Sequence, residues 1–115
     1  MGQSTLTNKV MRDREILADM YADEYFPRHL VDECKAILVQ VCHRIETEQP
    51  KDLDALYVIT HEATERLNGL QGAFEENDSE LETGAREALG EEFDVIAKAY
   101  GFEADVEELI APREW

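Results

Sequence analysis

Three histidines each have a glutamate one helical turn further along the chain, a spacing that can place two metal ligands on one helix face. The pairs are His29 with Glu33, His43 with Glu46, and His61 with Glu65. Because 27 of the 115 residues are acidic, such neighbours also arise often by chance. Neither Glu-x-x-His nor His-Glu-x-x-His, the spacings typical of helical metal sites, occurs in the chain. We therefore predict solvent-exposed histidines and expect no metal or other cofactor.

One carboxylate falls where a helix is expected to be apolar. Glu92 lies inside the hydrophobic sector of a helix expected over residues 81–100. Burial of a carboxyl group is rare without a partner, and in general it raises the pKa and suits the group to general acid–base chemistry. Thr60, Thr64 and Gln71 are polar positions on the stripe of the preceding helix and are the expected hydrogen-bond partners. The competing interpretation places Glu92 at the solvated rim.

The charge of the chain is strongly acidic and uneven. The chain has 27 acidic and 11 basic residues, a formal net charge of -16. Of the acidic residues, 13 lie within residues 75–108, where Arg86 and Lys98 are the only basic ones. Such a surface repels phosphate backbones and anionic membranes, which argues against nucleic-acid and membrane partners.

Two interpretations of this acidic region remain open. It is either a solvated face that aids solubility or a docking face for a basic protein partner. The predicted partner face consists of Glu75, Glu76, Glu80, Glu91, Asp94 and the terminal Trp115.

The cysteines and the hydropathy indicate the compartment. Cys34 and Cys42 are eight residues apart on one expected helix, about 12 Å along its axis, too far to form a disulfide. Both lie on its apolar stripe and are predicted to be buried, reduced thiols. The polar N-terminus lacks the apolar stretch of a secretory signal, and no segment approaches the roughly 18 apolar residues of a membrane span. We expect a cytoplasmic protein.

The elements that position these residues are predicted to be helices. Apolar residues recur at helical spacing over residues 30–45, 53–74 and 81–100, which predicts three long helices. Shorter helices are expected over residues 13–21 and after residue 105. No segment alternates with the two-residue period of a strand.

Local signals mark the expected helix ends. Asp52 is a predicted N-cap, and Ser79 with Glu82 forms a predicted capping box. Gly101 stands where a left-handed C-cap is expected, with Phe102 folding back onto the helix.

Short connections around Pro50 and Asn77 make neighbouring long helices antiparallel. The predicted fold is an all-α, small up-and-down bundle of three long helices with short helices at its N- and C-terminal ends. Residues 1–11 are predicted to be a disordered or loosely attached arm, and residues 12–115 a single domain. Whether it is a monomer or a homodimer stays open.

Several segments carry a distinctive signature. They are Asp19-Met20-Tyr21, Tyr25-Phe26-Pro27, Leu30-Val31-Asp32, Lys35-Ala36-Ile37-Leu38, the stretch from Phe74 to Glu80, and the ending from Ile96 to Trp115. Over about residues 12–115 the chain resembles a family of small bacterial proteins catalogued only as a domain of unknown function. The resemblance implies a bacterial origin and a helical domain, and it brings no activity or catalytic residues.

Two functions follow from these observations. The first is a cytoplasmic acidic protein-interaction module without catalytic activity. The alternative is a small enzyme or ligand-binding helical bundle centred on a buried Glu92. A solvent-exposed Glu92 would exclude the alternative.

Overall fold

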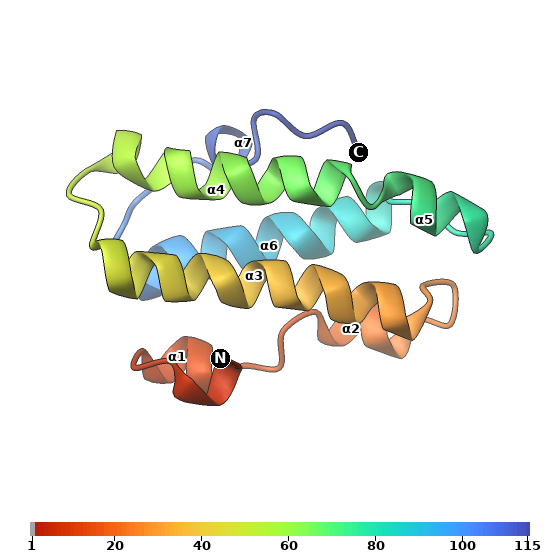
Figure 1. Cartoon of the computed structure of the whole chain (residues 1–115), viewed down its shortest axis with the longest axis horizontal. Coiled ribbons are helices and arrows are strands. Elements are labelled where there is room, and N and C mark those ends of the chain that lie inside the picture. The colour runs from red at the N-terminus through yellow and green to blue at the C-terminus, as the bar shows by residue number, and fades with distance from the viewer. Residues whose placement is uncertain (1) are drawn as a thin grey trace.

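The computed structural model describes residues 2–115, and within this range it contains helices and no strand, so the all-α class is confirmed. These residues form one short 3-10 helix and seven α-helices, and the α-helices are labelled in Figure 1. They are η1 (Gln3–Thr5), α1 (Lys9–Asp13), α2 (Ala18–Ala22), α3 (Arg28–Glu48), α4 (Leu53–Asn68), α5 (Gln71–Glu76), α6 (Thr83–Ala99) and α7 (Val106–Leu109).

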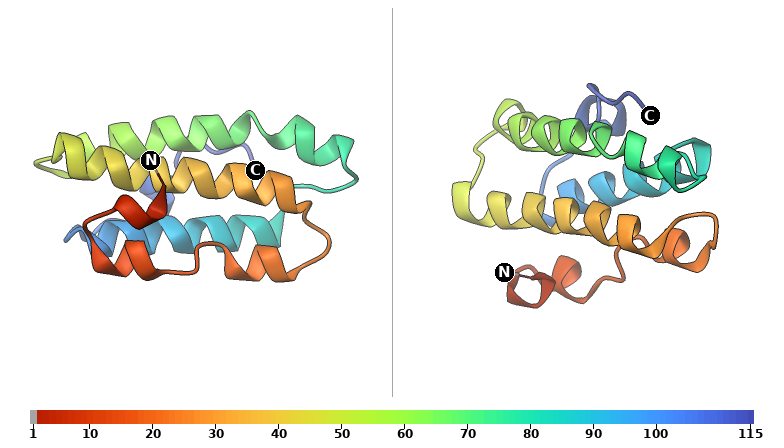
Figure 2. Two further views of the ribbon diagram at one scale, coloured as in Figure 1. Left: turned by 60° about the horizontal axis from the view of Figure 1, so that its bottom comes forward. Right: turned by 45° about the vertical axis from the view of Figure 1, so that its right-hand side comes forward.

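The three longest helices, α3, α4 and α6, lie alongside one another, and each runs antiparallel to the long helix before it (Figure 1). The short helices α1 and α2 pack on the side formed by α3 and α6, whereas α7 packs against α4 and α6 on the opposite side (Figure 2). A single core of buried apolar residues extends from Leu6 to Trp115. The N- and C-terminal segments therefore both contribute to the core.

The helix α3 carries the stripe that the sequence indicated. Its buried residues include Leu30, Val31, Leu38 and Ile45, at the spacing of one helix face. Cys34 and Cys42 are fully buried and unpaired, as predicted. Burial raises the pKa of both thiols to about 12. Neither thiol is therefore a nucleophile at neutral pH.

The helix predicted over residues 53–74 is in fact two helices, α4 and α5. The predicted N-cap is confirmed, since the Asp52 carboxylate accepts a hydrogen bond from Ala55 N–H at 2.9 Å. The break falls at Gly69 and Leu70, where glycine has low helix propensity. Asn68 also bonds the C-terminal segment there, donating to the Pro112 carbonyl at 3.1 Å.

The capping box predicted at Ser79 is wrong. Ser79 N–H donates to the Phe74 carbonyl at 2.9 Å, and Asp78 has a left-handed φ of 57°. This is a Schellman motif that closes α5, so Ser79 belongs to the end of one helix and not to the start of the next. The N-cap of α6 is Glu82, without a side-chain hydrogen bond.

A second Schellman motif closes α6, as the sequence indicated. Gly101 has φ 86°, and Phe102 N–H donates to the Ala97 carbonyl at 2.8 Å. Glycine adopts this left-handed conformation without the steric cost of a Cβ. Phe102 packs against the core.

The prediction of a loose N-terminal arm over residues 1–11 is wrong for residues 2–11; Met1 lies outside the described residues. Leu6 and Met11 are buried in the core. The Asn8 side chain donates to the Ala99 carbonyl at 2.7 Å, which joins this segment to the end of α6. The helix predicted over residues 13–21 forms only in its second half, as α2, because α1 already ends at Asp13 and residues 14–17 are not helical.

Candidate functional site

Glu92, the candidate carboxylate, is buried, with only 4% of the residue exposed. Its Oε1 accepts a hydrogen bond from Arg14 Nε at 2.7 Å. Its Oε2 accepts one from Arg14 Nη2 at 3.2 Å and one from the backbone N–H of Leu17 at 3.0 Å. The carboxylate is thus held as a fully hydrogen-bonded ion pair, the usual condition for a buried charge.

The prediction that Thr60, Thr64 and Gln71 hydrogen-bond Glu92 is wrong. Thr64 Oγ1 donates to the Thr60 carbonyl at 2.8 Å, and Thr60 Oγ1 donates to the Tyr57 carbonyl at 3.4 Å. Both hydroxyls bond carbonyls of their own helix because a buried threonine reaches back along it most readily. Gln71 is half-buried in α5 and makes no hydrogen bond with Glu92. The polar cluster predicted for an enzyme or ligand site does not assemble.

A second carboxylate, Glu46 of α3, also accepts hydrogen bonds from backbone N–H groups of the N-terminal segment. It accepts hydrogen bonds from the backbone N–H groups of Thr7 and Asn8, each at 3.0–3.1 Å, and from the Tyr100 hydroxyl at 2.5 Å. Burial by itself would raise the pKa of Glu46, but the hydrogen bonds outweigh it and lower the pKa to about 2.

Glu46 and Glu92 therefore fasten residues 7–17 to α3 and α6. Glu92 bonds Leu17 where that residue has a left-handed φ of 59°. A β-carbon makes this conformation unfavourable, so the buried hydrogen bond helps to maintain it. The role of Glu92 shown by these contacts is structural.

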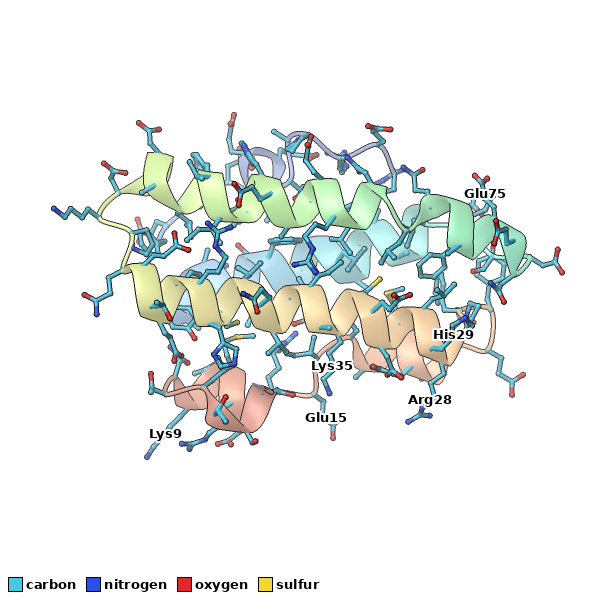
Figure 3. All side chains as sticks on the ribbon, viewed as in Figure 1. Lys9, Glu15, Arg28, His29, Lys35 and Glu75 are labelled. Carbon is cyan, nitrogen blue, oxygen red and sulfur yellow. The ribbon has the colours of Figure 1, made fainter. Side chains whose placement is uncertain are left out.

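The histidines occupy three different environments. His29 is exposed on α3 (Figure 3). His43 is buried, contrary to the prediction, because its Nε2 bonds the Gly2 carbonyl at 3.0 Å under the N-terminal segment. His61 is half-buried, stacks on Tyr57 and bonds the Glu108 carbonyl at 2.6 Å. Within residues 2–115 no three His, Cys, Asp or Glu side chains form a group that could hold a metal ion.

The predicted partner face is not one continuous surface. Glu75, Glu76 and Glu80 are exposed near α5, and Glu75 points outward at that end of the molecule (Figure 3). Glu91 is exposed on α6, and Asp94 is half-buried in an ion pair with Lys98 at 2.8 Å. The prediction that Trp115 belongs to the partner face is wrong, because the residue is only 5% exposed and packs in the core.

A more concentrated acidic surface lies between α2 and α6. Asp19 and Asp23 approach it from α2 and its C-cap, and Glu87 and Glu91 from α6. These four carboxylates line a hollow of about 290 Å³, whose other lining residues are Met20, Phe26, Gly84 and Ala88. We call these eight residues the acidic hollow. No basic residue among those described lines it.

The acidic hollow adjoins two further depressions. One, of about 410 Å³, lies between α6 and α7, and the other, of about 250 Å³, lies beside the Arg14–Glu92 pair. Glu91 lines all three. The sequence carried a usable signal for this surface: Asp19 with Asp23 and Glu87 with Glu91 are each spaced by four, which puts both members on one helix face.

Comparison with known proteins places the chain in a family. A profile described as "Family of unknown function (DUF5713)" matches residues 10–115. The chain belongs to this family. Its membership confirms the resemblance noted in the sequence, and the family's description assigns no activity. No curated protein and no solved structure matches the chain.

One further structural observation concerns the membrane. In the described part of the chain, no helix combines the length and the apolarity of a membrane span.

Proposed function

We propose that this chain is a protein-interaction module that binds a basic segment of a partner protein at the acidic hollow. The observation that carries the proposal is the composition of that hollow: four carboxylates, no basic residue and an apolar floor. Asp19, Asp23, Glu87 and Glu91 are all exposed, and none forms an ion pair with a described residue.

The chemistry of the hollow suits a lysine or arginine side chain. The aliphatic stem of such a residue packs on apolar surface while its charged end stays among polar groups. Phe26 and Ala88, both half-buried, supply the apolar contact, and the four carboxylates supply the complementary charge. The excess negative charge of the whole chain accelerates encounter with a basic partner, most strongly at low salt.

This proposal moves the partner face that the sequence suggested. Glu91 remains at its centre, Glu75, Glu76 and Glu80 become peripheral, and Trp115 is excluded by burial. A cytoplasmic location is part of the proposal. It is supported by the two unpaired buried cysteines, which suit a reducing compartment.

A peptide of ten lysines, labelled with a fluorophore, tests the charge of the hollow by fluorescence anisotropy. The variant Asp19→Asn/Asp23→Asn/Glu87→Gln/Glu91→Gln is compared with Glu75→Gln/Glu76→Gln/Glu80→Gln/Glu103→Gln, which removes the same number of exposed carboxylates elsewhere. We expect about tenfold weaker binding for the first variant, equivalent to about 1.4 kcal/mol, and less than about twofold for the second. Equal weakening in both variants would show that the peptide senses only net charge.

A second variant tests the shape of the hollow without changing its charge. Gly84 lines the hollow near the start of α6, and a β-carbon added there meets no atom within 4 Å. Gly84→Leu is therefore expected to fill the hollow, lower peptide affinity and leave the melting temperature unchanged or raised, since leucine favours helix more than glycine does. Gly72→Leu, at an equally open position in α5, is the matched control. Unchanged affinity in Gly84→Leu would exclude the hollow as the contact.

A further inference from the structure

A second surface of the molecule differs from the acidic hollow in its charge. Two adjoining grooves, of about 520 Å³ and 510 Å³, follow the outer side of α3, and Asp32 and Lys35 line both. The other basic residues in the two linings are Arg28 and Arg66, and the other acidic one is Glu15. On a chain with net charge -16, these grooves together have three basic residues against two acidic ones.

The basic residues of the grooves lack carboxylate partners. Arg12, Arg14, Arg44, Lys98 and Arg113 each form an ion pair, whereas Arg28, Lys35 and Arg66 form none with any described residue. Lys9, Lys51 and Arg86 also form no ion pair with a described residue, so the feature that distinguishes Arg28, Lys35 and Arg66 is their position along two connected grooves. Arg28 also contacts an aromatic ring, so the charges of Lys35 and Arg66 are the ones available to a ligand.

The carboxylate closest to Lys35 along α3 is already engaged. Asp32 accepts a hydrogen bond from the Tyr21 hydroxyl at 2.5 Å, and this bond, after burial, contributes to raising the pKa of Tyr21 to about 12. The Arg28 guanidinium lies 5.3 Å from the centre of the same ring. Tyr21 therefore contacts both Asp32 and Arg28. Lys35 lies with Asp32 where the two grooves meet and forms no ion pair with a described residue.

Lys35 is well placed to receive a ligand. It is half-buried and extends from α3 towards the connection between α1 and α2, where Glu15 also lies (Figure 3). Ile16 and Val39, both largely buried, provide apolar wall on either side of it. A charged group flanked by apolar surface is the usual composition of a small-molecule site.

We propose that these grooves bind a small organic anion whose carboxylate or phosphate group pairs with Lys35. Arg66, which lines the groove of about 520 Å³ from α4, supplies a second cation for the same ligand. The site is separate from the acidic hollow, and the proposal does not depend on the function proposed for that hollow.

Two probes, citrate and inorganic phosphate, test the proposal and distinguish its two anionic groups. Each is titrated into the isotopically labelled full-length chain, with sodium chloride adjusted to hold the ionic strength constant. We expect saturable shifts of the backbone amide signals of residues 32–40 with at least one probe. Lys35→Gln is expected to weaken that binding about tenfold, because the substitution removes the positive charge and its charge-assisted hydrogen bond to the anion.

Lys51→Gln is the matched control, because Lys51 is also without an ion pair but lies outside both grooves. Saturation by citrate alone would assign a carboxylate ligand, and saturation by phosphate alone a phosphate ligand. Shifts that do not saturate with either probe, or equal affinities in Lys35→Gln and Lys51→Gln, would overturn the proposal.

Discussion

Arg14 and Glu92 are 78 residues apart in the chain, yet their side chains meet at 2.7 Å in an ion pair that is nearly closed to solvent on the Glu92 side. The pair fixes the connection between α1 and α2 against α6. A buried ion pair is most sensitive to the loss of one member, because the remaining charge is left without compensation.

We expect Arg14→Met to lower the free energy of unfolding by about 3 kcal/mol, measured by urea denaturation. The double variant Arg14→Met/Glu92→Leu is expected to be more stable than Arg14→Met alone, since it leaves no unpaired buried carboxylate. Arg12→Met, at an exposed ion pair with Asp13, should change stability by no more than about 0.5 kcal/mol. A double variant less stable than Arg14→Met would contradict this account.

The hydrogen bonds of Glu46 predict a pH dependence of stability. Its pKa is about 2 in the folded chain and about 4.5 when unperturbed, so the unfolded state binds the proton more readily. The stabilisation is therefore present above about pH 4.5 and is lost as the pH falls towards 2. Glu46→Gln is expected to flatten the fall of unfolding free energy over this range. Glu103→Gln, at an exposed position, should leave the slope unchanged; the same flattening there would count against the assignment to Glu46.

The packing of the N-terminal segment predicts a stability contribution from Met11, which is fully buried. We expect Met11→Ala to destabilise the chain by about 2–4 kcal/mol, the usual result of removing a large core side chain. Val10→Ala is the control, since Val10 is 56% exposed and should cost less than about 0.5 kcal/mol. Thermal unfolding followed by circular dichroism measures both. Similar melting temperatures for the two variants would contradict the packing of Met11 and support the sequence-based prediction of a loosely attached N-terminal arm.

The burial of Trp115 predicts a fluorescence signature. Trp115 is the single tryptophan, and the Arg86 guanidinium donates to its carbonyl at 3.1 Å. We expect weak quenching by acrylamide in the folded chain and at least about twofold stronger quenching in Arg86→Gln, because loss of a charge-assisted hydrogen bond loosens the segment. Arg66→Gln is the control, because Arg86 and not Arg66 bonds the Trp115 carbonyl, and its quenching should match that of the unsubstituted chain. Strong quenching of the unsubstituted chain would mean that the indole is exposed.

The parts of the fold that sequence predicts well are those governed by neighbours in the chain. The stripe from Leu30 to Ile45 specifies α3, because one helix face must be apolar to be buried. Gly101 marks the end of α6, because the left-handed conformation favours glycine. The capping box predicted at Ser79 also rested on a local pattern, but that prediction was wrong. The backbone N–H of Ser79 is already bonded to the Phe74 carbonyl in the turn that closes α5.

The Arg14–Glu92 pair and the acidic hollow join residues that are far apart in the chain, and the sequence did not predict these contacts. The burial of Glu92 follows from its helix face, but nothing near it in the chain indicates Arg14 as its partner. The acidic hollow combines one pair of carboxylates from α2 with another from α6. Each pair is visible as a spacing of four residues, whereas their meeting depends on how the short helices pack on the long ones.

The docking of residues 7–17 also affects how the chain folds during synthesis. Leu6 and Met11 are synthesised more than 80 residues before Glu92 and Ala99, which hold this segment in place (the shortest separation is 92 − 11 = 81). Two apolar side chains must remain without their native environment for most of that time. The polar residues Gln3, Ser4, Thr5 and Thr7 surround Leu6 in the sequence, and polar neighbours of this kind in general limit the association of an exposed apolar residue with other chains.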